Sequence, residues 1–330
     1  MLSGQLASVM TAETVTWPQC PSNCNCAGSS AAARDPKLVV DCHERIEVDR
    51  EKLSNQLNSM LSSNLTYGRL SSLSIVNSPL TDVPRSICRL MTLRELHLDN
   101  NRLNQLPDNC LGNLSNLIRF SVSGNVIDTL QDGVFDGLRK MQYLELGKNR
   151  IDSIGLSVFA TSSNLSNLFT IILSENKLTS LEPWIYDRGL IGSFERPVTI
   201  DLSINKISKF TNNMGNYKLC SNKIPFEVLN LTYNNIKHFM DIINGWQLDI
   251  KQVLSCYKIV KNKLNIEILN DDNIPCDCVN YQHYVMLSLK NKPFDFRTMR
   301  LSCNFTDPLT KKSVIMRSFY RPIGPQSVCL

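Results

Sequence analysis

Apolar residues along the chain recur in one phrase, in which leucine or a related residue alternates with polar residues and is followed by asparagine. The clearest copy begins at Leu93 and reads LRELHLDNNRL, with its asparagine at Asn101. The same frame, L-x-x-L-x-L-x-x-N-x-L, fits six further segments, which begin at Leu70, Leu117, Met141, Leu168, Pro197 and Phe226. A degraded copy, IEILNDDNIP, follows the last of them. Such repeats indicate an array of stacked units, each of which buries its apolar faces only against its neighbours.

The L-x-L part of each copy, such as Leu96–Leu98, predicts a short strand whose successive side chains point to opposite sides. The leucines then face the interior, the residues between them face outward, and neighbouring strands stack into a parallel sheet. A single copy would fit an amphipathic helix equally well, but seven copies in one register favour the strand.

A polar residue follows each predicted strand at a fixed position in the turn. An asparagine there can satisfy backbone groups that are costly to bury unpaired, so we expect these side chains to stack along the array. Successive positions up to Asn234 are 23 to 29 residues apart. The full set is Ser78, Asn101, Asn125, Asn149, Asn176, Asn205, Asn234 and, in the degraded copy, Asp271.

Return segments such as IDTLQDGVFDGL insert further apolar residues into the core from the other side. The predicted fold is therefore a right-handed horseshoe solenoid of the β/α type. Its strands form a parallel concave sheet, and its convex side consists of irregular, 3-10 and short helical segments.

Cysteines cluster at both ends of the array, where a stack of repeats exposes apolar surface and needs a cap. Eight of the twelve form two groups, Cys20, Cys24, Cys26 and Cys42 at one end and Cys276, Cys278, Cys303 and Cys329 at the other. An even number in tight groups suggests disulfides and an oxidising compartment, although spacing alone leaves the pairing open. Zinc is the alternative for such clusters, but the usual second C-x2-C knuckle or histidine pair is absent, so no metal is expected.

Four further cysteines lie within the array. Cys88 and Cys110 occupy the return segments of adjacent repeats, where a disulfide is favoured over two buried thiols. Cys220 and Cys256 bracket a repeat and an enlarged loop, and a bridge between them would restrain the least regular part of the array.

The repeats and caps together resemble extracellular leucine-rich-repeat proteins. This resemblance implies the cap pairs Cys20–Cys26, Cys24–Cys42, Cys276–Cys303 and Cys278–Cys329. From Cys20 to Cys329 the chain resembles the ectodomain of an invertebrate, mollusc-like Toll-like receptor. The segments that carry this resemblance are DTLQDGVFDGLRKMQYLELGKNRI, LTSLEPW, the insertion from ISKFTNNMGNY to LC, and KHFMDIINGW. The resemblance implies a receptor of innate immunity that dimerises, with itself or a second receptor, on a microbial or endogenous ligand and signals through a cytoplasmic TIR domain.

Four parts are expected along the chain. Residues 1–19 have no basic residue and no sustained apolar run, so they resemble an unstructured leader or a foreign remnant more than a signal peptide. Residues 20–66 are predicted as the N-terminal cysteine cap, 67–273 as about eight repeats and 274–330 as the C-terminal cap. No run of about 18 apolar residues occurs, so a membrane anchor is expected only outside this sequence. The predicted location is extracellular or at the cell surface.

The outward positions of the predicted strands form a broad face of the kind that solenoids commonly use for binding. Their mixed charges, with an exposed tyrosine and isoleucine, suit a protein or mixed polar partner better than bare lipid. Ordinary solvated strand residues are the alternative for any single position. The candidate ligand-binding residues are Arg94, Glu95, His97, Asp99, Arg119, Tyr143, Glu145, Lys148, Ile172 and Glu175. Nucleic acid is not expected as a partner, because the net charge of +5 is spread along the chain without a basic run.

Five N-x-S/T sequons fit a secretory route and predict glycosylation at Asn64, Asn113, Asn164, Asn230 and Asn304. Asn230 lies between two inward leucines, so its side chain is expected to emerge on the concave face. A glycan there would obstruct that end, and ligand contact is therefore expected over earlier repeats or on a lateral face.

Catalysis is not expected. The four histidines, His43, His97, His238 and His283, fall in unrelated segments, and no G-x-S-x-G, H-E-x-x-H or phosphate-binding glycine loop occurs. No cofactor is expected either. The predicted function is the extracellular recognition module of a Toll-like receptor, and the alternative is a secreted or matrix interaction protein without a signalling domain, because one fold serves many functions.

Overall fold

The computed structural model describes twelve stretches of the chain. They are residues 20–22, 24–29, 34–42, 50–62, 70–107, 110–159, 165–181, 198–210, 226–236, 267–269, 303–306 and 313–316. All statements on structure below refer to these residues.

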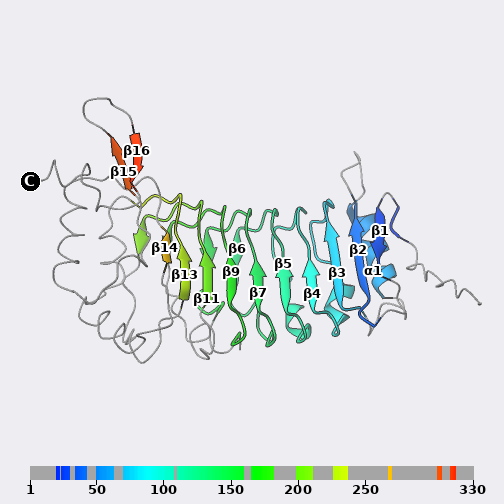
Figure 1. The fold of residues 1–330 in the computed structure, drawn as a ribbon. Coiled ribbons are helices and arrows are strands. Elements are labelled where there is room, and N and C mark those ends of the chain that lie inside the picture. Colours follow the sequence, from blue (N-terminus) through cyan, green and yellow to red (C-terminus); the bar gives the residue numbers. More distant parts are fainter. Residues whose placement is uncertain are drawn as a thin grey trace, which may run out of the picture.

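One ten-stranded sheet runs along the molecule, and its strands lie side by side in the order in which they occur in the sequence (Figure 1). The strand β1 pairs antiparallel with β2, and every later neighbour in this sheet pairs parallel. The strands are β1 (Asn25–Gly28), β2 (Lys37–Asp41), β3 (Ser72–Val76), β4 (Glu95–His97), β5 (Arg119–Ser121), β7 (Tyr143–Glu145), β9 (Thr170–Ile172), β11 (Val198–Asp201), β13 (Phe226–Asn230) and β14 (Glu267–Leu269).

Alternation of side chains along each strand builds the core, as the L-x-L phrase predicts. The register aligns one inward residue from each strand, and Leu73, Leu96, Phe120, Leu144 and Ile171 form a row of fully buried side chains. Burial of each leucine or phenylalanine contributes roughly 1.5–3 kcal/mol relative to exposure. Each rung therefore depends on the rungs on either side of it.

The return segments close the core on the side opposite the sheet. They contain the 3-10 helices η1 (Arg85–Arg89) and η2 (Leu111–Asn113) and the two-residue strands β6 (Thr129–Leu130), β8 (Ser153–Ile154), β10 (Ser180–Leu181) and β12 (Lys209–Phe210). The strand β6 pairs with β8, and β10 pairs with β12. The fully buried Phe135 and Phe159 stack with ring centroids 6.0 Å apart. The predicted solenoid, with a parallel sheet and an irregular return side, is confirmed.

An asparagine ladder runs along the turns that follow the strands. From Asn101 to Asn234, each Nδ2 donates to a carbonyl of its own turn and to the equivalent carbonyl of the preceding rung, at 2.9 to 3.1 Å. From Asn125 onward, each Oδ1 also accepts a backbone N–H of the preceding rung at 2.9 to 3.1 Å. The predicted stacking is confirmed. At the first rung Ser78 replaces the asparagine, and the buried Asn101 Oδ1 has no partner.

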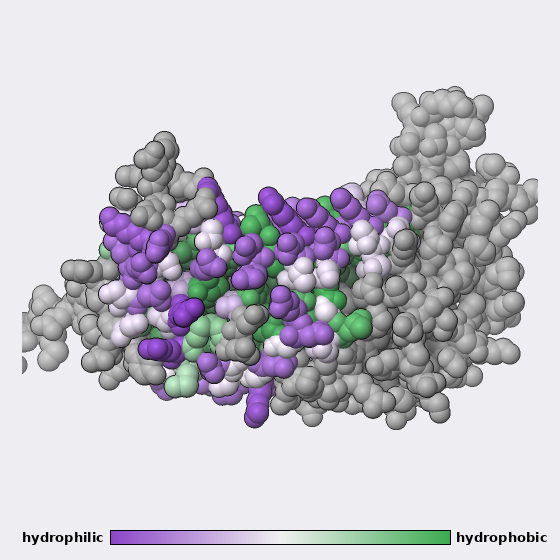
Figure 2. Space-filling view, turned by 180° about the vertical axis from the view of Figure 1, so that it is seen from behind, coloured by the Kyte–Doolittle hydropathy of each residue, from purple (hydrophilic) through white to green (hydrophobic). Residues whose placement is uncertain are grey.

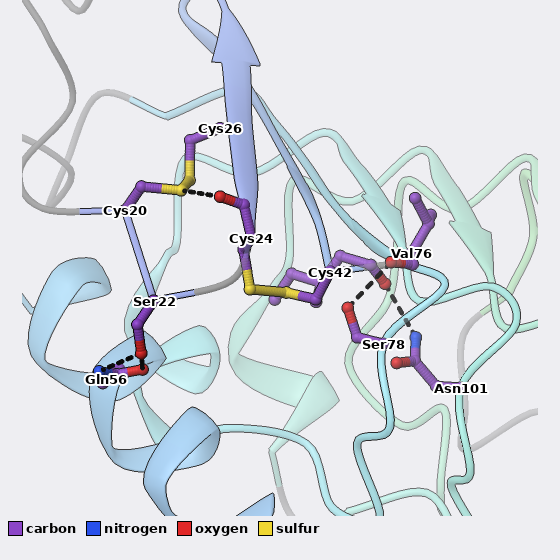
Figure 3. Close-up of a disulfide and its surroundings, with 10 residues drawn as sticks. Cys20, Ser22, Cys24, Cys26, Cys42, Gln56, Val76, Ser78 and Asn101 are labelled. Carbon is purple, nitrogen blue, oxygen red and sulfur yellow. Dashed lines mark hydrogen bonds between the residues drawn. A yellow bond between two sulfur atoms is a disulfide. The ribbon is translucent and has the colours of Figure 1, made fainter. Parts of the chain in front are cut away.

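The N-terminal cap closes the first end of the core. The hairpin of β1 and β2 is tied by the disulfides Cys20–Cys26 and Cys24–Cys42 (Figure 3), and parallel pairing of β2 with β3 joins the cap to the array. The helix α1 (Arg50–Leu61) buries Leu53, Leu57 and Leu61, whose spacing of four places them on one helix face. Both N-terminal pairs are those that the family resemblance implies.

A third disulfide, Cys88–Cys110, joins the return segments of adjacent rungs, so the bridge predicted there is confirmed. The strands β15 (Cys303–Thr306) and β16 (Ser313–Met316) form an antiparallel pair within the predicted C-terminal cap. Cys220, Cys256, Cys276, Cys278 and Cys329 lie outside the described residues, and for Cys303 only the backbone is described. None of the described helices is long and apolar enough to cross a membrane. The four-part division of the chain stays a prediction.

Candidate ligand-binding surface

The sheet face, meaning the side of the main sheet turned away from the core, brings most of the predicted binding residues together. Strand register places Glu95, Arg119 and Tyr143 in one row. His97, Glu145 and Ile172 belong to the next row. Arg94 lies directly before β4, and Asp99 lies two residues beyond its end. All of them are at least partly exposed, so the face is open to a partner.

Three of these side chains form a connected group that we call the Arg119 cluster, consisting of Arg119, Tyr143 and Glu145. The Tyr143 hydroxyl donates to Glu145 Oε2 at 2.8 Å, and the backbone N–H of Gly147 reaches Glu145 Oε1 at 3.3 Å. The Arg119 guanidinium carbon lies 5.3 Å from the centre of the Tyr143 ring, in the range of a cation–π contact. The tyrosine is thus held at its hydroxyl and covered on one face.

The electrostatics of this cluster follow from partial burial. Burial, followed by the hydrogen bond to Glu145, raises the pKa of Tyr143 to about 12, so its hydroxyl stays protonated and remains a donor. Burial is also the largest cause that raises the pKa of the Glu145 carboxyl above its ordinary value, and the charges of Asp99 and Asp201 act in the same direction. Hydrogen bonds from Tyr143 and Gly147 oppose that rise.

Asp99 organises the turn beside the cluster. Its Oδ1 accepts the Ser121 hydroxyl at 2.5 Å and the backbone N–H of Ser123 at 2.8 Å, both from the next rung. Its Oδ2 lies 3.8 Å from His97 Nδ1. Asp99 is therefore committed to holding two rungs together and is less available to a ligand than its position in the sequence suggests.

Two cross-rung ion pairs use further predicted residues. Lys37 Nζ lies 3.8 Å from Glu95 Oε2, and Lys148 Nζ lies 3.8 Å from Glu175 Oε1. Exposed pairs of this kind contribute about 0–1 kcal/mol, because water and salt screen them. Their main effect here is to orient the acidic partner of each pair.

Lys148 and Glu175 belong to a row that sequence reasoning did not recognise. The residue before each ladder asparagine has a positive φ, and the row continues with Ile204 (φ 54°) and Tyr233 (φ 56°). A β-branched residue is uncommon in this left-handed conformation. Ile204 and Tyr233 are 49% and 58% exposed. The signal in the sequence was an apolar residue directly before the ladder asparagine of two successive repeats.

The predicted glycosylation sites are only partly described. Asn113 is exposed in η2, and Asn230 is partly exposed at the end of β13, where its Oδ1 accepts the N–H and the hydroxyl of Thr232 at 3.1 and 2.9 Å. Asn230 pairs in register with Asp201, whose Oδ1 accepts the Ser203 N–H. Asn64 and Asn164 lie outside the described residues, and for Asn304 only the backbone is described.

Seen from behind in Figure 2, the described surface is mainly hydrophilic, with hydrophobic residues in smaller areas between the polar ones. Among the described residues, no group of three or more histidine, cysteine, aspartate or glutamate side chains is arranged to hold a metal ion. His43, His238 and His283 lie outside those residues.

Comparison with known proteins supports a leucine-rich-repeat protein. Residues 91–151 match the family model described as leucine rich repeat. Osteomodulin of Bos taurus is 32% identical over 92 residues, which are 28% of this chain and 20% of that protein. Leucine-rich repeats and immunoglobulin-like domains protein 3 of Homo sapiens is 26% identical over 222 residues, 66% of this chain and 16% of that protein. The chain therefore matches much less than two thirds of the length of either relative.

Among solved structures, the complex of TLR13 with ssRNA13 is 25% identical, with a TM-score of 0.40 over 52% of this chain and 22% of that chain. Nothing in these matches points to catalysis, and proteins built from such repeats are typically interaction modules.

Proposed function

We propose that this leucine-rich-repeat protein is the extracellular recognition module of a Toll-like innate immune receptor and binds a protein or microbial ligand through the sheet face. The observation that supports binding there is the Arg119 cluster, a tyrosine and an arginine held in place on a rigid parallel sheet. Tyrosine and arginine, with tryptophan, are enriched among interface positions that carry binding energy.

Rigidity of the face supports the same function. Strands of adjacent rungs pair in register, and the ladder asparagines hold the turns beyond them. A surface that is ordered before binding loses less side-chain and backbone freedom when a partner arrives, so more of the contact energy appears as affinity.

The disulfides support the proposed extracellular location. Three bridges within and beside the first rungs are typical of a chain that folds in an oxidising environment. The assignment to a Toll-like receptor rests on the segments that resemble such ectodomains, and it implies a ligand-induced dimer, a membrane span and a TIR domain outside these residues.

Fractionation of the native protein tests this assignment. Cells are separated into membrane and soluble fractions, deglycosylated and blotted for an epitope within residues 91–151. The expected result is a membrane-bound species much larger than the 37.3 kDa of this chain. A soluble species near 37.3 kDa would contradict the receptor and support a secreted interaction protein instead.

A further inference from the structure

Arg119 carries a charge that no acidic neighbour among the described residues neutralises. It lies between two acidic residues of the adjacent strands, Glu95 in register on β4 and Glu145 on β7. Glu95 is turned toward Lys37, and Glu145 accepts the Tyr143 hydroxyl and the Gly147 N–H. Among the described residues, the Arg119 guanidinium has its cation–π contact with Tyr143 and no carboxylate within ion-pair distance.

The free guanidinium is also oriented. The cation–π contact holds the guanidinium over the Tyr143 ring, and the hydrogen bond to Glu145 restricts the ring itself. A guanidinium presents a rigid set of N–H donors that matches a carboxylate with two parallel hydrogen bonds. Because the side chain is exposed, these donors are available to a partner.

We propose that Arg119, stacked on Tyr143, is the anchor that receives the carboxylate of an aspartate or glutamate side chain from a protein ligand. This inference rests on the proposed function and names the chemistry of the partner at that surface. The Tyr143 ring supplies an apolar wall beside the anchor, which suits the methylene stem of an acidic side chain.

Charge complementarity favours one carboxylate over a polyanion. Asp99, Glu145 and Asp201 lie on the same face, and the charges of Asp99 and Asp201 disfavour ionisation of Glu145. A row of phosphates or sulfates would meet this acidic background, whereas a single carboxylate can reach Arg119, and the exposed Arg94 has no ion-pair partner among the described residues. The two residues lie on adjacent rungs, where Arg94 O accepts the backbone N–H of Arg119 at 3.0 Å.

A displayed library of random peptides provides the probe. The full-length, disulfide-intact chain is panned in parallel with four variants, Arg119→Gln, Arg119→Lys, Arg139→Gln and Ile172→Lys. Arg139 is exposed on a return segment and serves as the charge-matched control, and Ile172 tests the sheet face two strands beyond Arg119. Each variant is first checked for an unchanged unfolding transition.

Peptides selected by the native chain are expected to be enriched in aspartate or glutamate beside an apolar residue. Arg119→Gln should weaken the binding of these peptides about tenfold or more, because glutamine cannot donate the two parallel hydrogen bonds that arginine offers to a carboxylate. Arg119→Lys should restore only part of the affinity, and Arg139→Gln should leave it unchanged. Millimolar inorganic phosphate should not displace the peptides.

Four outcomes overturn the inference. Equal losses in Arg119→Gln and Arg139→Gln would show unspecific charge attraction, and displacement by phosphate would show a general anion site. Peptides without acidic enrichment that are lost in Ile172→Lys but kept in Arg119→Gln would refute the anchor while leaving the proposed function intact. Peptides whose binding is unchanged in every sheet-face variant would refute both the anchor and the proposed function.

Discussion

At the scale of single residues, the ladder asparagines are the most constrained polar side chains in the described structure. Asn149 is buried and donates to Val122 O, Leu146 O and Gly147 O at 3.0 to 3.1 Å, while its Oδ1 accepts the Ile127 N–H at 3.1 Å. The amide is the one common side chain that donates and accepts in this way. This explains why the same residue type returns at that position in successive repeats.

Replacing Asn149 by alanine should lower the free energy of unfolding by about 2–4 kcal/mol, since buried backbone groups of two rungs lose their partner. Urea unfolding followed by circular dichroism measures the loss. Asn104→Ala is the matched control, because Asn104 is exposed and outside the ladder, and it should change stability by less than about 0.5 kcal/mol. Equal effects of the two substitutions would refute a special role for the ladder.

The raised pKa of Glu145 predicts how the stability of the folded protein changes with pH. Its folded pKa is raised, mainly by burial, so the folded state holds the proton more tightly than the unfolded state. The stability linked to this proton is present below the unfolded pKa and is lost as pH rises through the folded pKa. Glu145→Gln removes this titration, and its amide can still accept from Gly147 and donate to the Tyr143 hydroxyl.

The variant Glu145→Gln should therefore gain stability relative to the native chain as pH rises from about 4 to about 7. Chemical unfolding at a series of pH values measures the difference between the two proteins. A difference that is constant with pH, or that shrinks as pH rises, would show that Glu145 does not titrate with a raised pKa.

At the scale of elements, disulfides reinforce the first rungs, where the ladder is incomplete. Cys88 and Cys110 join η1 to the start of η2 with Cα atoms 4.9 Å apart and a sequence separation of 22. In the same region Ser78 stands in place of the ladder asparagine, and Asn101 Oδ1 lacks a partner. The bridge holds together two return segments that the ladder does not reach.

Replacing both Cys88 and Cys110 by serine should lower the free energy of unfolding by about 3 kcal/mol, chiefly by relaxing a constraint on the unfolded chain. Thermal unfolding of the native and variant chains gives the comparison. Reduction of the native chain should mimic the variant only if the cap disulfides are left intact. An unchanged unfolding temperature would contradict the structural role of this bridge.

At the scale of the whole molecule, a glycan at Asn230 would divide the sheet face into an open part over β4 to β9 and an obstructed part beyond β11. We expect Asn230→Gln to remove one glycan, seen as faster migration on a gel, and to leave the affinity for peptides selected on the Arg119 cluster unchanged. Lost or strengthened binding in that variant would place the ligand over Asn230 and contradict the expectation.

Residue pattern alone was sufficient to predict the solenoid, because the L-x-L alternation and the turn asparagine are local features that every repeat restates. Cysteine spacing pointed to the N-terminal cap and to Cys88–Cys110 for the same reason, and the resemblance to a family supplied the cap pairing. The row that ends in Ile204 and Tyr233 was missed because its left-handed backbone is set by the turn geometry, and the residue type at those positions does not indicate it.

Tertiary structure decided which of the outward side chains act together. Tyr143 and Glu145 lie on one rung and Arg119 on the preceding one, and their contacts depend on strand register and on which neighbour each charged group selects. In the sequence, Asp99 and Glu95 are acidic residues at outward positions like Glu145. In the structure, Asp99 accepts the Ser121 hydroxyl and Glu95 forms an ion pair with Lys37. The repeat pattern determines the direction of a side chain, whereas its partner can lie on another rung, as for Arg119 and Glu95, or on its own rung, as for Glu145.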